Sequence, residues 1–297
     1  MQDLFEIFSK NYNKNEGVIE KALYIVPTPI GNLEDITIRA INILNKCDII
    51  ICEDTRVSGN MLNFYGINNK KLYVYNDHSS EEQRSNIINL LNNNSVALVT
   101  DAGTPLISDP GYKLVYECKK QNIKVIPLPG ASASITALSA SGIGSDTFLF
   151  YGFLSSKNGE KTKEIQNILK NESTTICYET ANRLLSTLEI ITSLDENRKI
   201  CVAREITKLH EDIKTDNVKN ILDYYSNNKE RLKGEIVIII DKFQNTKLVE
   251  NNIDYDTINT YLKYLSAKDC SNLLSDLYGF NRKEIYKKTL EAKQNER

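Results

Sequence analysis

The residues with the clearest chemical potential lie in one loop, Asp101–Pro110, which contains two aspartates, two prolines and a glycine. It follows Val96–Val99, a short apolar run that is typical of a strand buried on both faces of a sheet. Gly103 has no Cβ and the prolines fix φ, so the loop can bring bare backbone close to a ligand. The alternative is an ordinary strand–helix connection, but those are mostly about two to six residues long. We therefore interpret Asp101–Pro110 as a ligand-binding loop.

Three more loops of unusual composition follow other expected strands, namely Pro27–Asn32, Glu53–Arg56 and Pro129–Ala133. In open α/β sheets, ligands bind in the crevice outside the carboxyl ends of the strands, so we expect the four loops to cluster. Gly130 and Ser132 stand at a helix start, where free N–H groups favour an anion, although Ser132 taken alone reads as a plain N-cap. The sequence contains neither G-x-G-x-x-G nor G-x-x-x-x-G-K-[ST], which argues against dinucleotide and P-loop sites.

The Glu53–Arg56 segment places three charges in four residues after a buried strand. Charges at such a place need partners or solvent. In the functional interpretation, Arg56 holds an anion such as a nucleic-acid phosphate, while Asp54 or Glu53 orients it or receives a proton. In the alternative, the three side chains form a local salt-bridge cluster with no further role.

The elements that must position these loops alternate between strand and helix up to about residue 142, which predicts a parallel α/β lobe. Asp35 is the expected N-cap of the first helix. Expected strands are 23–26, 49–52, 72–75, 96–99 and 124–126, and expected helices are 36–46, 57–65, 81–91, 112–120 and 132–141.

The second half has a different pattern and predicts a mixed α+β lobe. Segment 205–215 lacks helical periodicity and suits an antiparallel edge or a loop. Expected strands are 148–151, 174–178, 199–203 and 235–240, and expected helices are 161–170, 181–191 and 218–225.

The remainder predicts a polar linker, 242–252, and a small helical unit with helices 255–265, 267–277 and 282–293. Residues 277–282 resemble a helix-turn-helix corner. From residue 258 onward, eight Lys/Arg outnumber five Asp/Glu, which could seat a polyanion or form only a solvated helix face. The expected organisation is an N-terminal extension (1–22), an α/β N-terminal lobe (23–146), a mixed second lobe (147–242) and a linker with a helical domain (243–297).

Composition narrows the function class. The chain of 297 residues is 41% hydrophobic and 26% charged, as in ordinary globular proteins. Its net charge of −2 argues against an extensively basic surface for nucleic acid. The six cysteines form no C-x-x-C pair, and we expect them to be buried and reduced. The two histidines, His78 and His210, are too few for a metal cluster, and we expect them at the surface. The apolar runs are too short for a bilayer and the N-terminus lacks a signal-peptide layout, so we expect a cytoplasmic protein without a metal.

Taken together and in order, these segments resemble the ribosomal RNA small subunit methyltransferase I family, a branch of the tetrapyrrole-methylase superfamily. The resemblance spans about residues 23 to 290. Any one motif is weak, but the ordered set is specific. The matching segments are Tyr24–Leu33, Glu53–Arg56, Asp101–Pro105, Asp109–Gly111, Pro127–Ala133, Tyr151–Leu154, Tyr178-Glu179 with Arg183, Ala203–Lys208 and Lys233–Val237.

The resemblance implies a two-lobed tetrapyrrole-methylase-like fold that binds S-adenosylmethionine between the lobes of a homodimer. It also implies 2′-O-methylation of a cytidine in the decoding region of 16S rRNA in the small ribosomal subunit. Carried across by motif, the cofactor-binding residues are Ile30, Ala102, Gly103, Thr104, Ile107, Ser132 and Ala133 from the first lobe, with Glu179 and Ala203 from the second.

The resemblance leaves the proton acceptor open among Asp54, Asp101 and Lys208. Arg56 and Arg204 are the expected phosphate clamps, with Glu53 beside them on the substrate side. Two alternatives remain: a methyltransferase acting on a corrin or other tetrapyrrole precursor, and a ribosome-associated binding protein without catalysis. The charged Glu53–Arg56 segment and the basic C-terminal unit suit a phosphate-rich substrate better than a macrocycle.

Overall fold

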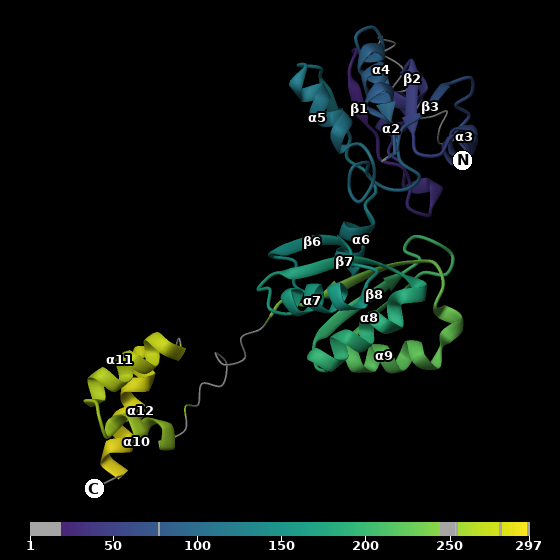
Figure 1. The fold of residues 1–297 in the computed structure, drawn as a ribbon. Coiled ribbons are helices and arrows are strands. Elements are labelled where there is room, and N and C mark those ends of the chain that lie inside the picture. Colours follow the sequence, from purple (N-terminus) through teal and green to yellow (C-terminus); the bar gives the residue numbers. More distant parts are fainter. Residues whose placement is uncertain (1–18, 77, 244–252, 254, 279–280, 296–297) are drawn as a thin grey trace. The chain divides into compact units, whose positions relative to one another are not determined.

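The computed structural model describes residues 19–76, 78–243, 253, 255–278 and 281–295 (Figure 1). The chain divides into two compact units, one up to Lys242 and one from Phe243. Each is described by itself below. The expected N-terminal extension and the expected linker lie largely outside the described residues, as do the two central residues, 279 and 280, of the expected 277–282 corner.

The first lobe is built on a parallel sheet with strand order β3-β2-β4-β1-β5. Every residue of the three central strands is buried, because helices cover both faces, and this explains their unbroken apolar sequences. The strands are β1 (Leu23–Ile25), β2 (Ile49–Cys52), β3 (Lys71–Val74), β4 (Val96–Leu98) and β5 (Val125–Pro127). This sheet confirms the predicted parallel lobe.

Two helix starts in this lobe differ from the prediction. The helix expected from Ile36 begins at Ile38, and its cap is Thr37, whose hydroxyl accepts from the Ala40 N–H at 3.1 Å. Asp35, the predicted cap, lies in a short 3₁₀ turn, η1 (Leu33–Asp35). The helix expected from Val57 begins at Thr55 with Asp54 as its cap. In both cases several residues could cap, and sequence alone does not choose among them.

The helices of the first lobe divide its core into two layers, one on each face of the sheet. One layer includes Leu44 and Leu62, and the other includes Ile88 and Leu114. The helices are α2 (Ile38–Lys46), α3 (Thr55–Phe64), α4 (Glu81–Leu91), α5 (Tyr112–Lys120) and α6 (Ala133–Ala140).

The second lobe contains a mixed sheet with strand order β6-β7-β10-β8-β9. β6 pairs parallel to β7, and the remaining pairs are antiparallel. The strands are β6 (Phe148–Phe153), β7 (Thr174–Thr180), β8 (Lys199–Arg204), β9 (Asp212–Asn217) and β10 (Glu235–Ile240). The structure therefore confirms a mixed α+β lobe, and β9 supplies the antiparallel edge predicted within 205–215.

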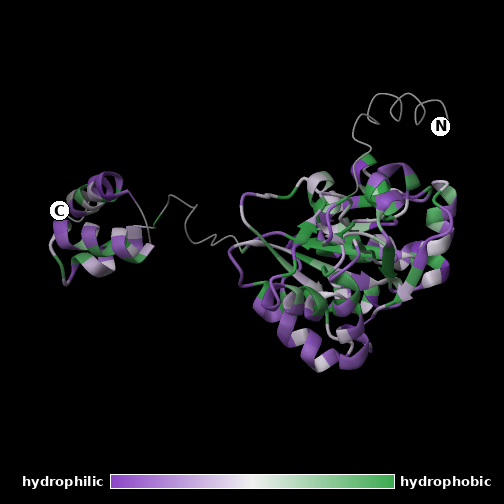
Figure 2. Cartoon of the chain, turned by 90° about the horizontal axis from the view of Figure 1, so that it is seen from above, coloured by the Kyte–Doolittle hydropathy of each residue, from purple (hydrophilic) through white to green (hydrophobic). Residues whose placement is uncertain are grey.

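Alternation along β10 decides what each face of this sheet covers. Ile236, Ile238 and Ile240 pack on the helices, whereas Val237 and Ile239 face α6 and the first lobe. The helices are α7 (Asn158–Ile168), α8 (Ala181–Leu194) and α9 (Val218–Asn227), followed by a short 3₁₀ turn, η2 (Lys229–Arg231). The strands are mainly hydrophobic and the outer helix faces hydrophilic (Figure 2).

The C-terminal unit consists of α10 (Tyr255–Leu262), α11 (Ala267–Tyr278) and α12 (Arg282–Asn295). Its core contains Ile258, Cys270, Leu274, Ile285 and Ala292. These helices follow the three predicted ones closely, because their apolar residues recur at helical spacing.

Candidate functional site

Three loops of the first lobe are joined by hydrogen bonds at the carboxyl edge of its sheet. Thr28 and Gly103 exchange backbone hydrogen bonds of 2.9 and 3.0 Å, and the Thr28 hydroxyl donates to the Thr100 carbonyl. The Thr104 hydroxyl donates to the Ala131 carbonyl at 2.9 Å. The fourth loop adjoins them, because the Asp54 backbone hydrogen-bonds to Asp101, so the clustering expected from parallel strands is present.

Backbone conformation explains one glycine in these loops, and close approach between loops explains another. Gly103 has a φ of +86°, a conformation that side chains disfavour. A Cβ on Gly130 would lie 2.4 Å from the Pro27 Cβ. Only glycine therefore lets the Pro27–Asn32 and Pro129–Ala133 loops meet without displacement.

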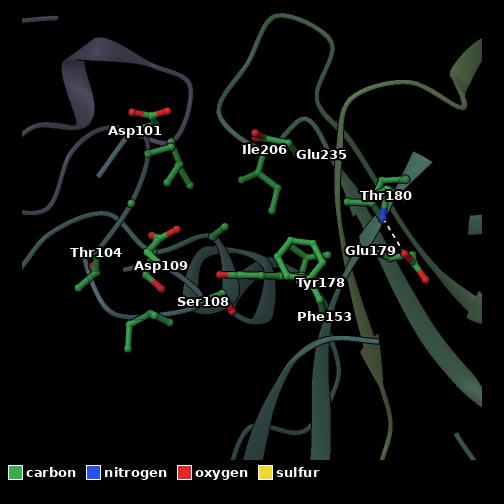
Figure 3. Close-up of a pocket in the computed structure, with 18 of the residues that line it drawn as sticks. Asp101, Thr104, Ser108, Asp109, Phe153, Tyr178, Glu179, Thr180, Ile206 and Glu235 are labelled. Carbon is green, nitrogen blue, oxygen red and sulfur yellow. Dashed lines mark hydrogen bonds between the residues drawn. The ribbon is translucent and has the colours of Figure 1, made fainter. Parts of the chain in front are cut away.

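These loops and the second lobe enclose a cavity of about 340 Å³, called here the first cavity. Its size falls within the roughly 300–1,000 Å³ of small-molecule sites. Asp101 lies on one side, and Ile206 and Glu235 lie across from it (Figure 3). Most of the predicted cofactor residues line it: Ile30, Ala102, Gly103, Thr104, Ile107, Ser132, Ala133 and Glu179. Ala203 does not, because it is fully buried in β8, where it pairs with Val237 of β10.

The loops around the first cavity contain strained backbone. Leu106 and Ser108 have φ values of 77° and 65°, and Glu205 and Thr207 have values of 50° and 67°. Non-glycine residues rarely adopt positive φ, and such residues cluster at ligand sites where surrounding contacts hold them. The four strained residues lie in the two loops that face each other across the cavity, one from each lobe.

The start of α6 is open to a ligand. Ser132 is its N-cap residue, but its hydroxyl makes no N-cap hydrogen bond with any described residue and lies 3.1 Å from the Ser134 hydroxyl instead. Ser132 therefore holds the predicted N-cap position, but its hydroxyl does not cap the helix. Ser132 and Ala133 line the first cavity, so the helix-start N–H groups and the positive end of the dipole can meet an anion there.

Aromatic side chains form much of the second-lobe wall, a contribution that sequence analysis missed. Tyr178 lies in the cavity wall with its ring packed edge-on against Phe150 and Phe153, at centroid distances of 5.1 and 5.4 Å (Figure 3). Phe153 also lines the cavity, in β6 beside β7. The signal was available in the Tyr151–Leu154 and Tyr178-Glu179 motifs, but only as a family match.

The Glu179 carboxylate lies in a buried polar network on the α8 side of β7. It accepts from the Thr180 N–H at 2.8 Å and from the Thr187 hydroxyl at 2.7 Å, and pairs with Arg183 at 3.2 Å. Lys161, also buried, donates to the same Thr187 hydroxyl. At 2% exposure Glu179 therefore holds the end of β7 in place rather than presenting its charge to the cavity.

The first loop meets the second lobe at Gly31 and Thr207. The Asn32 N–H donates to the Thr207 hydroxyl at 3.1 Å. A Cβ on Gly31 would lie 2.5 Å from the Lys208 Cγ and 2.7 Å from the Thr207 hydroxyl. Any side chain at Gly31 must therefore displace the neighbouring loop and change the spacing between the two walls.

Lys208 is held as a cation. Its ammonium donates to Glu205 at 2.8 Å and to Glu235 at 3.0 Å. Partial burial opposes the charged form, but the two carboxylates outweigh it and raise the pKa of Lys208. A protonated amine has no lone pair, so the prediction of Lys208 as proton acceptor is not supported by its surroundings.

The pKa values of the two candidate aspartates are shifted in opposite directions. Partial burial, with the nearby Asp54 charge, raises the pKa of Asp101 above its usual 3.8. Hydrogen bonds from Arg56, at 2.7 Å from its guanidinium and 2.8 Å from its backbone N–H, lower the pKa of Asp54 to about 2. Asp101 lines the first cavity, while Asp54 caps α3 outside it. Asp101 is therefore the better placed and the more basic of the two.

The predicted substrate-binding residues differ in how far they are exposed. Arg56 is 88% exposed at its side chain and pairs with Asp54, so the local ion pair anticipated as an alternative does form. Arg204 is only 7% exposed, and its guanidinium donates to the His210 and Lys233 carbonyls. Arg204 therefore holds the turn after β8 and is not available to a phosphate, which corrects its predicted role. Glu53 is half-buried and lines neither cavity.

A second cavity of about 470 Å³ adjoins the first and shares four lining residues with it, Ile30, Asp101, Ala102 and Glu235. One face of α3 supplies its outer wall through Val57, Asn60, Met61 and Phe64. Sequence analysis did not identify these four residues. Their spacing was visible, but it also fits a helix packed on the core.

The remaining predictions concern the cysteines, the histidines, metal binding and membrane-spanning helices. All six cysteines lie among the described residues with buried thiols, and burial raises the pKa of each. Within the described ranges, no group of three or more His, Cys, Asp or Glu could hold a metal ion. His78 and His210 are exposed. A search of the described helices for one long and apolar enough to cross a membrane finds none.

Comparison with solved structures finds the same fold at low sequence identity. A diphthine synthase matches with a TM-score of 0.56 and 15% identity, covering 74% of this chain and 89% of that one. A cobalt precorrin-4 methyltransferase matches with a TM-score of 0.55 and 16% identity, covering 76% and 98%.

Comparison of sequences gives much closer relatives. The family model of the tetrapyrrole (corrin/porphyrin) methylases matches residues 22–222. A ribosomal RNA small subunit methyltransferase I from Rickettsia prowazekii is 43% identical, over 91% of this chain and 96% of its own length. Proteins of the same name from Pasteurella multocida (42% identical, 91% and 96% covered) and Escherichia coli O157:H7 (41%, 91% and 94%) match similarly. The chain therefore belongs to the tetrapyrrole methylases and, within them, to the family of methyltransferases named ribosomal RNA small subunit methyltransferase I.

Proposed function

We propose that this protein transfers a methyl group from S-adenosylmethionine to the ribose 2′ hydroxyl of a cytidine in the decoding region of 16S rRNA. The observation that carries the proposal is the first cavity, in which the family's ordered motifs from both lobes meet beside Asp101. The names of the relatives supply the substrate, ribosomal RNA of the small subunit.

The first cavity suits S-adenosylmethionine in three respects. The open start of α6 at Ser132 and Ala133 can accept the methionine carboxylate. Ile30, Ile107 and Val237 give apolar surface for the adenine and ribose. Backbone of the 102–104 segment lies along the wall, where carbonyl dipoles can face a cation. When bound, this cofactor supplies a methyl group on a positively charged sulfur.

Asp101 is the residue we assign to the proton of the acceptor hydroxyl. Its carboxylate lies where the two cavities meet, and its raised pKa makes it a better base than an exposed aspartate. The fixed loops contribute by orientation, because methyl transfer requires the attacking oxygen in line with the bond that breaks. Lys208, charged and paired with two carboxylates, positions the 205–208 loop in this scheme.

The remaining assignments concern the partner and the assembly. Arg56 is an exposed cation in the first turn of α3 and is assigned to an RNA phosphate, with Glu53 beside it. The exposed apolar side chains of β6, Phe148, Leu149 and Tyr151, support a homodimer. The proposed ribosomal RNA substrate implies a location in the cytoplasm. The boundaries 23–146, 147–242 and 243–297 stay our proposal for the functional division of the chain.

Small subunits from a strain that lacks this protein provide the test. Incubation with the purified protein and isotopically labelled S-adenosylmethionine should add one labelled methyl group to 16S rRNA, located by mass spectrometry on one cytidine. A 2′-O-methyl group should also protect the adjacent phosphodiester from alkaline cleavage, which needs a free 2′ hydroxyl. If the protein binds S-adenosylmethionine but transfers no methyl group to RNA, the proposed substrate is wrong. That result would favour a macrocyclic acceptor.

A further inference from the structure

The second cavity lies against the first but differs from it in composition. The first-lobe side of the first cavity is lined largely by loop backbone and small residues, whereas side chains of α3 line the outer wall of the second cavity. Asp101 borders both. An acceptor atom must approach from a space that reaches Asp101 without occupying the first cavity, and the second cavity meets this requirement.

The α3 face brings together the groups that a single nucleobase needs. Residues 57, 60, 61 and 64 recur at helical spacing and therefore share one side of the helix. Phe64 leaves 51% of its surface exposed, so its ring is accessible to a partner. Asn60 carries an amide that can both donate and accept, as the Watson–Crick edge of a base requires.

The rim of the second cavity is fixed before any ligand arrives. The Tyr65 hydroxyl donates to the Leu33 carbonyl, which joins the end of α3 to the first loop. Tyr65 also packs edge-on against Phe64 at 5.2 Å between ring centroids, which restricts the Phe64 ring. On the opposite side, Lys208 and Glu235 form the wall. A rigid aromatic surface of this kind suits stacking by a flat ligand.

From this geometry we propose that the second cavity receives the target nucleoside, turned out of its RNA stack. The base stacks on Phe64, Asn60 reads its Watson–Crick edge, and the ribose points toward Asp101. Enzymes that act on the base itself extrude it from the stack into such a pocket, and the same movement here would bring the ribose 2′ hydroxyl to Asp101. Arg56, directly before Val57 in α3, then stands at the rim to meet a neighbouring phosphate. The inference rests on the proposed RNA substrate and adds the residues that recognise it.

Asn60→Ala and Asn63→Ala form a matched pair for the test. Both asparagines are exposed in α3, but only Asn60 lines the second cavity. With small subunits from the deletion strain as substrate, N60A should raise KM for the subunit about tenfold or more, while N63A should behave as wild type. S-adenosylmethionine binding, measured by calorimetry, should be unchanged in both variants.

Phe64 gives an independent test of stacking. Phe64→Ala should also raise KM for the subunit about tenfold, whereas Phe64→Tyr, which keeps the ring, should restore it. Thermal melting of each variant excludes unfolding as the cause. If N60A and F64A match wild type while wild type methylates the subunit, the nucleoside assignment is wrong and the proposed function stands. If wild-type protein transfers no methyl group to the subunit, the proposed function itself fails.

Discussion

The two cavities beside Asp101 are built by different means. Loops that hydrogen-bond to one another, with Gly103 at a positive φ and Gly130 at a point of close approach, form the first-lobe wall of the first cavity. Side chains on one face of α3 form the outer wall of the second. A site made of backbone keeps its shape because each loop holds the next, while a site made of side chains can vary its specificity without disturbing the fold. Cofactor binding and acceptor recognition should therefore separate under mutation.

Asp101→Asn should break activity most severely, because Asp101 is the group shared by both cavities. Loss of a general base lowers kcat by about 10²–10⁴-fold. Since asparagine has nearly the same shape, S-adenosylmethionine affinity should change little. Single-turnover methylation of small subunits gives the rate, and calorimetry gives the affinity.

The control for this change is Asp223→Asn, which removes an exposed carboxylate of α9 outside both cavities. It should match wild type. An Asp101→Asn protein with near-normal kcat would show that water takes the proton without help from this carboxylate.

Gly31→Ala should cause the next largest loss, because it disturbs the spacing between the lobes. The added Cβ would lie 2.5 Å from the Lys208 Cγ, so one of the two loops must move. A displacement of about 1 Å at a reacting centre can lower the rate about 10²-fold. Unlike Asp101→Asn, this change should weaken cofactor binding as well, since Ile30 lines both cavities.

Gly159→Ala is the matched control, because a Cβ there meets nothing within 4 Å. Circular dichroism melting should show both variants folded. Wild-type kinetics in Gly31→Ala would mean that the spacing between Gly31 and Lys208 is not needed for the reaction.

The pH dependence should distinguish Asp101 from an ordinary aspartate. A base must be deprotonated to act, so kcat/KM should fall about tenfold per pH unit below the Asp101 pKa. Burial raises that pKa, so the acidic limb should lie above 3.8. A pH–rate profile on stable protein measures this limb, and it should disappear in Asp101→Asn. An unchanged limb in that variant would assign it to another group.

The backbone-made site was largely predictable, and the side-chain-made site was not. Glycine and proline at the ends of apolar strands mark places where the chain must turn sharply, and Gly103 and Gly130 lie at such turns. By contrast, Asn60 and Phe64 sit in an unremarkable helix, and nothing in their spacing separates a cavity wall from a core face. Only the position of α3 relative to Asp101 makes the difference, and that depends on tertiary packing.

The surroundings of the charged side chains were the hardest feature to predict from the sequence. Arg204 ends one buried strand and Arg56 follows another, yet Arg204 is buried against backbone carbonyls and Arg56 is exposed. Lys208 lies in a matching motif but is paired with two carboxylates. For Arg204 and Lys208, part of the environment that sets the role of the charge comes from groups distant in sequence, the Lys233 carbonyl and Glu235.

Arg56→Ala should have the smallest effect, and it tests whether the α3 side of the second cavity meets RNA. The side chain is 88% exposed and paired with Asp54, so its removal leaves both cavities intact. Loss of one phosphate contact should raise KM for the small subunit a few-fold and reduce the slope of log affinity against log salt by about one. Arg39→Ala, an exposed arginine of α2, should leave both quantities unchanged. Cofactor affinity should be the same in all three proteins, because Arg56 contributes nothing to the first cavity. Equal losses of RNA methylation and cofactor binding in Arg56→Ala would instead mean that the two cavities are coupled through α3, and the separation between a backbone-made and a side-chain-made site would not hold.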